Sequence, residues 1–214
     1  MHPLSRLQGG LEELYRVATG VRVTDFVVDD DARDQLGPGR RPREQLLVCE
    51  DDGELSVGLY VDPEVVAALH ATLGGQHPRG GLSAANFSPF LLALEGVSHF
   101  VYTVLCARDA RAVTALELEL QAEVDKYVTC VLTLGADASP DLRRRLFVDV
   151  DYEDDLDGDE RDRYRAANDN AHRYATYLEE AFVAPGRVGA MLPELRRFYR
   201  HPLARKLEVI AKAA

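Results

Sequence analysis

The chain has no tryptophan, two methionines and only three cysteines among its 214 residues. Cys49, Cys106 and Cys130 lie in apolar stretches, and none has the short spacing of a metal-binding or redox pair. An odd number of cysteines without a regular pattern of spacings excludes a secreted domain stabilised by disulfide bonds. It is consistent with reduced thiols. A chain of this length buries roughly 70% of its unfolded surface, so it needs no such staple.

No stretch reaches the roughly 18 uninterrupted apolar residues that a membrane-spanning helix requires. The closest is 88–107, SPFLLALEGVSHFVYTVLCA, in which Glu95 and His99 lie near the middle. A charge at that depth costs roughly 2.5–3.5 kcal/mol, so we interpret this segment as a buried core helix. The first residues also lack the basic-then-apolar pattern of a secretory signal. We therefore expect a cytoplasmic protein that does not associate with a membrane.

Known catalytic signatures are also lacking. The sequence has no nucleophile elbow, zinc-protease helix, kinase signature or dinucleotide-binding fingerprint. The segment GGQHPRGG at 74–81 has glycines and a cation, but not the Lys-Ser/Thr pair of a phosphate-binding loop. The sequence therefore indicates no particular reaction and leaves enzyme activity undecided.

Lysine is scarce, because only Lys126, Lys206 and Lys212 occur among the 25 basic residues. This preference for arginine indicates a GC-rich, bacterial genome. The net charge of −11 argues against nucleic-acid or anionic-membrane binding over the whole surface. Residues 185–214 are the exception, since seven Arg or Lys and two Glu give this segment a charge of +5.

The first 73 residues combine helical and strand patterns. Residues 4–18 have apolar residues at helical spacing, and VRVTDFVV at 21–28 is rich in β-branched residues and predicts a strand. Residues 45–61 predict a hairpin, because Asp52-Gly53 is a favoured turn pair and apolar residues alternate after it. We expect residues 1–73 to form a small unit with about three antiparallel strands.

The remaining residues are almost wholly helical in pattern. We expect a flexible Gly-rich linker over 74–87 and an α-helical bundle of about five to six helices over 88–214. The fold class is therefore α+β and predominantly helical. Helices are predicted over 88–107, 112–134 and 161–182, with two more divided near His201-Pro202.

The helix predicted over 88–107 contains a carboxylate and an imidazole four residues apart, Glu95 and His99. Residues i and i+4 share one side of a helix, and a helix without a polar face is buried. On the next helix Glu117 projects into the apolar stripe and Glu123 lies at its edge, whereas Glu119 falls away from it. Carboxylates and an imidazole in a bundle core can hold a metal. The candidate ligands for a divalent metal are Glu95, His99, Glu117 and Glu123.

An architectural alternative stays open for these residues. Glu95 and His99 can form an internal hydrogen-bonded pair, while an Arg or Tyr from another helix caps Glu117. Removing one partner of a buried pair costs roughly 3–5 kcal/mol, so such pairs persist for stability alone. The single Glu–His pair at i, i+4 also differs from the Glu-x-x-His motifs of di-iron bundles.

An acidic stretch, DVDYEDDLDGDE at 149–160, holds eight Asp and Glu. Aligning its glycine with that of a calcium loop places Glu153, Asp155 and Asp157 at ligand positions. Tyr164 then occupies the place of the bidentate Glu, so the loop departs from the pattern and predicts a weak calcium site at most. The alternative is a solvated loop whose last acids stabilise the start of the next helix.

The segment RRFYRHPLARK at 196–206 interleaves basic and aromatic residues. Such a pattern can follow a phosphate backbone and stack on bases, or dock on an acidic partner. An amphipathic helix with a solvated arginine face is the alternative. Candidate contacts for an anion or a nucleic acid are Arg196, Arg197, Arg200 and Arg205.

Taken together, the missing motifs and the uneven charge favour an interaction or regulatory module with a protein partner or a second copy. Two other functions stay open. One is a helical metal-binding protein or enzyme that uses Glu95, His99 and Glu117. The other is nucleic-acid binding through the basic C-terminal helices, which the overall charge disfavours.

Overall fold

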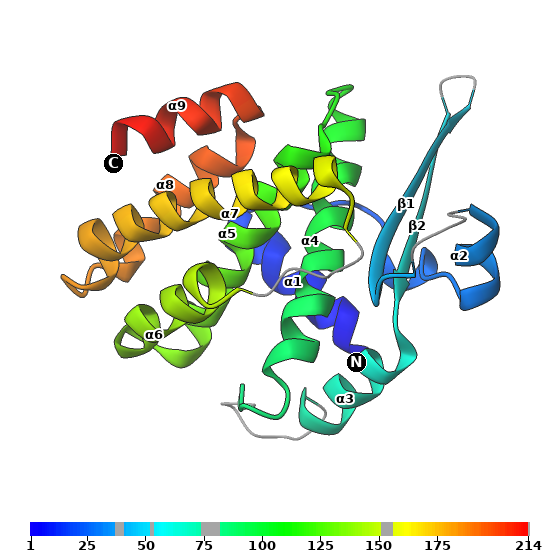
Figure 1. Ribbon diagram of the computed structural model, residues 1–214, viewed down its shortest axis with the longest axis horizontal. Helices are drawn as coiled ribbons and strands as arrows, with labels where there is room; N and C mark the ends of the chain where they lie inside the picture. The colour runs from blue at the N-terminus through cyan, green and yellow to red at the C-terminus, as the bar shows by residue number, and fades with distance from the viewer. Residues whose placement is uncertain (37–40, 52–53, 74–81, 151–155, 214) are drawn as a thin grey trace. The chain divides into compact units, whose positions relative to one another are not determined.

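The computed structural model describes residues 1–36, 41–51, 54–73, 82–150 and 156–213. As predicted, they form an α+β fold that is predominantly helical, with a small antiparallel sheet (Figure 1). The described chain divides into two compact units. The first unit is Met1–Glu13 with Val17–Ala112, and the second is Leu14–Arg16 with Val113–Ala214.

The first unit contains the sheet and the longest helix. Helix α4 packs against both strands and against α3. Helix α3 begins where the sequence favours it, with proline in its first position and the Asp62 Oδ1 accepting a hydrogen bond from the Glu64 backbone N–H at 2.8 Å. The elements are α1 (Pro3–Tyr15), α2 (Asp30–Leu36), β1 (Glu44–Asp51), β2 (Glu54–Val61), α3 (Pro63–Leu73) and α4 (Phe87–Arg108).

The predicted hairpin is confirmed. Strands β1 and β2 pair in antiparallel fashion, with Val48 opposite Val57 and Glu50 opposite Leu55. The predicted turn at Asp52-Gly53 lies outside the described residues. Leu59 and Val61 of β2 are buried and share one face of the strand, and Leu59 lies close to Gly96 of α4, which favours this register.

The predicted third strand is wrong, because the described sheet has two strands. Residues 21–28 form a 3₁₀ turn over Val23–Asp25 and a single parallel bridge between Val27 and Leu59. The Gln8 side-chain oxygen accepts a hydrogen bond from the backbone N–H of Val23 at 2.8 Å. A side chain of α1 thus satisfies backbone that a longer strand would have paired, and the β-branched residues pack without forming a ladder.

Helix α4 confirms the predicted core helix over 88–107. Among the described residues it is the one helix long and apolar enough to cross a membrane by length and composition. Of its most apolar window, 67% is buried inside the protein. This burial is consistent with the core helix of a soluble protein.

The second unit is helical, and the predicted helices over 112–134 and 161–182 and the two C-terminal helices are confirmed in type and approximate position. Helix α5 packs against α7, and α7 packs against α9. A π-helical turn follows α6, and another follows α7. The elements are α5 (Ala115–Leu134), α6 (Ser139–Arg143), α7 (Gly158–Leu178), α8 (Val188–Arg200) and α9 (Leu203–Ala213).

The predicted linker over 74–87 stays a prediction, because most of it, 74–81, lies outside the described residues. From residue 87 the chain is already in α4.

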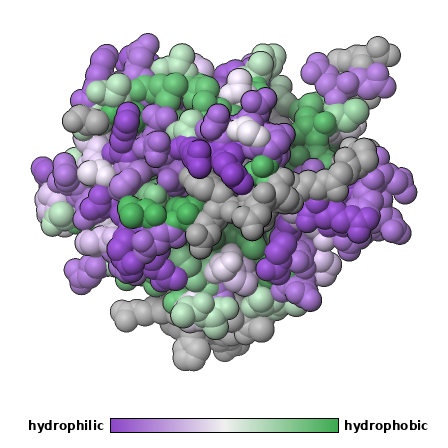
Figure 2. All heavy atoms as spheres, viewed as in Figure 1, coloured by the Kyte–Doolittle hydropathy of each residue, from purple (hydrophilic) through white to green (hydrophobic). Residues whose placement is uncertain are grey.

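The face seen in Figure 2 is largely hydrophilic and is interrupted by separate hydrophobic patches. Hydrophilic side chains therefore cover much of this face.

Candidate metal site

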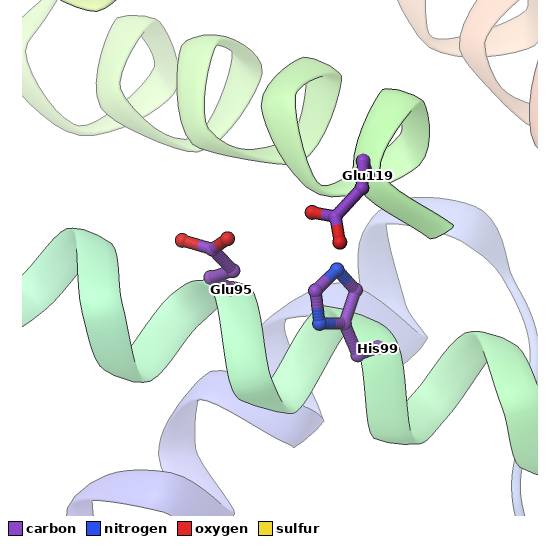
Figure 3. Close-up of side chains that lie close together, drawn as sticks. All are labelled: Glu95, His99 and Glu119. Carbon is purple, nitrogen blue, oxygen red and sulfur yellow. The ribbon is translucent and has the colours of Figure 1, made fainter. Parts of the chain in front are cut away.

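Helix α4 presents Glu95 and His99 one turn apart on the same side (Figure 3). Burial of its apolar residues stabilises this helix, and its proline lies in the first turn, where it costs no hydrogen bond. His99 is 6% exposed, whereas Glu95 is only partly buried. The pair therefore has a buried imidazole and a carboxylate that solvent can reach.

Both side chains of this pair can be ligands of a metal ion. Glu95 has carboxylate oxygens and His99 has imidazole nitrogens, and both residues come from α4, within the first unit.

A further acidic side chain, Glu44 at the start of β1, approaches the same histidine. Its Oε1 lies 3.7 Å from His99 Nδ1, and the two side chains are 9% and 8% exposed. Gly96 makes this approach possible, because a Cβ there would lie 2.7 Å from Glu44 Cγ and 2.8 Å from its Oε1. Glycine is thus required here for space rather than for backbone conformation.

The two other predicted ligands, Glu117 and Glu123, lie in α5, in the second unit. The backbone N–H of Glu117 donates to Thr114 Oγ1 at 3.2 Å, which caps the start of α5. Glu123 Oε1 accepts a hydrogen bond from Lys126 Nζ at 2.7 Å. A ligand role for these two glutamates stays a prediction.

Sequence reasoning missed Glu44. Glu44 reaches His99 through the hairpin, a contact between residues far apart in the sequence. The one available signal was Gly96, because an isolated glycine inside a strong helical pattern indicates the close approach of another part of the chain.

The predicted calcium loop is described only at its end. Glu153 and Asp155 lie outside the described residues. Asp157 is the N-cap of α7, where its Oδ1 accepts from the Glu160 N–H at 2.7 Å and Glu160 Oε2 accepts from the Asp157 N–H at 3.3 Å. This capping box gives Asp157 the structural role that the alternative interpretation assigns to the last acids of the stretch.

All four arginines proposed as anion contacts bind groups of the second unit itself. Arg196 donates to the backbone carbonyl of Leu14 at 2.9 Å, and Arg200 donates to those of residues 15 and 16 at 3.1 and 3.2 Å. These carbonyls lie at the C-terminal end of α1, where guanidinium groups are favourable hydrogen-bond partners. Arg197 and Arg205 each pair with a glutamate three residues away. Nucleic-acid contact by these side chains stays a prediction.

The second unit contains a different buried polar cluster. Lys206, which is fully buried, donates from Nζ to Gln121 Oε1 at 2.6 Å, and Gln121 Nε2 donates to Asp125 Oδ1 at 2.8 Å. The Tyr15 hydroxyl donates to the same Asp125 oxygen, and its ring stacks on Tyr199 with centroids 3.8 Å apart. Burial, followed by the charge of Asp125, raises the pKa of Tyr15 well above 10. We call these residues the Lys206 network.

The residues around His99 can in principle bind a cation or act as a proton donor and acceptor pair. Convergence of several oxygen atoms and one nitrogen atom favours the cation, because proton transfer needs a single donor and acceptor. No family model, curated protein or solved structure matches this chain. The functional argument therefore comes from the geometry and chemistry of these side chains.

Proposed function

We propose that this protein binds a divalent metal ion through Glu95 and His99 of α4. The observation that carries the proposal is their placement one turn apart on the same side of one helix, with the Glu44 carboxylate 3.7 Å from His99 Nδ1. A carboxylate oxygen and an imidazole nitrogen both bind first-row metal ions, at about 2.0–2.2 Å for Zn²⁺. Two ligands at i and i+4 on one face of a helix can bind the same ion.

The donor types narrow the choice of cation. Carboxylates suit Mg²⁺, Ca²⁺ and Mn²⁺, whereas imidazole suits Zn²⁺, Fe²⁺, Ni²⁺ and Cu²⁺. A set with both donor types favours a first-row transition metal that accepts oxygen and nitrogen, such as Mn²⁺, Fe²⁺ or Zn²⁺. The carboxylates of Glu95 and Glu44 also balance the charge of a divalent ion, which lowers the cost of burying it. The partly exposed Glu95 provides a route by which the ion enters.

The test is Mn²⁺ titration of chelator-treated protein, followed by the loss of the free-ion electron paramagnetic resonance signal. We expect wild type to bind one Mn²⁺ per chain, and Glu95→Gln to bind at least 100-fold more weakly while staying folded. Glu64→Gln is the matched control, because the Glu64 side chain is 89% exposed. Equal binding by wild type and Glu95→Gln, or no binding by wild type, would contradict the proposal.

A second candidate function is self-association through the hairpin, which extends the predicted interaction role. Val48 and Leu55 are 50% and 40% exposed, and β1 is an edge strand of the described two-stranded sheet. We propose antiparallel pairing of β1 with β1 of a second copy, centred on Val48. This register places Glu50 opposite Leu46 and Asp51 opposite Gln45, so no two acids face each other within residues 45–51.

Light scattering coupled to size-exclusion chromatography tests this pairing. Wild type should have the mass of a dimer at about 100 µM, and Val48→Lys should have the mass of a monomer. A monomeric wild type, or a dimeric Val48→Lys, would exclude this interface.

The three free cysteines are consistent with a reducing compartment, so we propose the cytoplasm as the location for either function.

A further inference from the structure

We infer that Glu44 is a positioning residue that holds His99 in the orientation needed for metal binding. The inference rests on the proposed function. Its first support is the 3.7 Å separation of Glu44 Oε1 and His99 Nδ1. With Nδ1 facing this carboxylate, Nε2 is the nitrogen that binds the ion.

The second support is that the fold holds Glu44 in place from two sides. Its backbone pairs with Val61 at the end of the hairpin, so the register of the sheet sets its position. Its side chain occupies the space left by Gly96, where a Cβ would also lie 3.0 Å from Leu59 Cδ1. Glu44 is therefore a 9% exposed carboxylate fitted against α4, unlike the exposed acids farther along β1.

A carboxylate in this position has a defined effect on a histidine ligand. Histidines that bind metals donate the N–H of their other ring nitrogen to a carboxylate, a carbonyl or water, which fixes the tautomer and increases the basicity of the ligating nitrogen. The present separation is slightly longer than a hydrogen bond. Ordering of the site around an ion closes this distance. Loss of such a partner lowers metal affinity by about 10–100-fold.

The experiment combines Mn²⁺ affinity with electron spin echo modulation, which detects a nitrogen atom bound to Mn²⁺. Wild type should show both the bound ion and nitrogen modulation. Glu44→Ala should bind at least tenfold more weakly and lose the modulation, because His99 is no longer oriented. Glu44→Gln should recover part of both, since its amide oxygen still accepts the Nδ1 proton. Glu50→Ala, which removes an exposed acid from the same strand, should behave as wild type.

Gly96→Ala tests the same inference while every donor atom is retained. The added Cβ displaces the Glu44 side chain, so this variant should resemble Glu44→Ala. Gly10→Ala is the control for a helical glycine, because nothing lies within 4 Å of a Cβ there. Unchanged affinity and modulation in Glu44→Ala would overturn the role of Glu44 and leave the proposed function standing. No Mn²⁺ binding by wild type would instead overturn the proposed function itself.

Discussion

Two buried polar clusters in this protein are built in different ways. In the Lys206 network donors alternate with acceptors, and hydrogen bonds of 2.6 and 2.8 Å connect Lys206 to Gln121 and Gln121 to Asp125. Around His99, the Glu44 carboxylate lies 3.7 Å from one imidazole nitrogen, and Glu95 lies one turn away on the same helix. The first cluster has the spacing of direct hydrogen bonds. The second has the wider spacing that leaves room for an ion.

This difference implies different roles. A buried ammonium and carboxylate connected through hydrogen bonds make the folded state depend on every member of the network. A metal site must instead leave its ligand atoms able to move onto an incoming ion. We therefore expect substitutions in the Lys206 network to change the stability of the protein, and substitutions around His99 to change what it binds.

The largest effect should come from Lys206→Met. The change leaves Gln121 Oε1 without its donor and removes the positive charge nearest to Asp125 in the network, so the free energy of unfolding should fall by about 3–5 kcal/mol. Urea denaturation measures this loss. Lys212→Met, at an exposed position on the same helix, should change stability by less than about 0.5 kcal/mol. Similar losses for the two variants would show that the network is not structural.

Tyr15→Phe should have the next largest effect. It removes only the hydroxyl that donates to Asp125 and keeps the ring stacked on Tyr199. A hydrogen bond to a charged group contributes about 1.5–3 kcal/mol, and a loss of this size is expected in urea. The stacking can be tested separately with Tyr199→Leu. No loss in Tyr15→Phe would mean that the hydroxyl contributes nothing to folding.

Alkaline pH should destabilise the second unit through its buried tyrosines. Burial raises the pKa of Tyr127 to about 12 and raises the pKa of Tyr174 as well, whereas unfolded tyrosines titrate near 10. The unfolded state therefore loses its protons first, and the stability present below pH 10 declines as the pH rises through 10 to 12. At pH 11 the loss should be about 1.4 kcal/mol for Tyr127.

Urea denaturation at pH 8 and pH 11 checks this dependence. Tyr127→Phe should reduce the difference between the two pH values, because a phenylalanine has no proton to lose. A stability that is the same at both pH values would contradict the proposed burial of these hydroxyl groups.

The smallest effect on folding is expected at the candidate metal site. Glu95→Gln keeps the shape of a partly exposed side chain, so the metal-free protein should lose less than about 1 kcal/mol. Urea denaturation in the presence of a chelator measures this change. A loss as large as that of Lys206→Met would show that Glu95 is architectural, as the alternative interpretation of the sequence holds.

Local patterns predicted the helical core and the pair on α4, but not the complete site. Spacing along one helix places Glu95 beside His99, and this was confirmed. The strand predicted over 21–28 failed because Gln8, from another element, satisfies its backbone. Glu44 approaches His99 through tertiary packing, which helical periodicity does not encode. A helix that is buried on most sides, such as α4, carries little information about which partner each side contacts.

The account is tested most directly by the effect of Mn²⁺ on the unfolding of three proteins. An ion at 100 times its dissociation constant stabilises the folded state by about 2.7 kcal/mol. Wild type and Lys206→Met should both gain this stability, since the Lys206 network takes no part in binding. Glu95→Gln, which binds at least 100-fold more weakly, should gain at most about 0.4 kcal/mol. An equal gain in Glu95→Gln, or no gain in wild type, would contradict the assignment of metal binding to the His99 cluster.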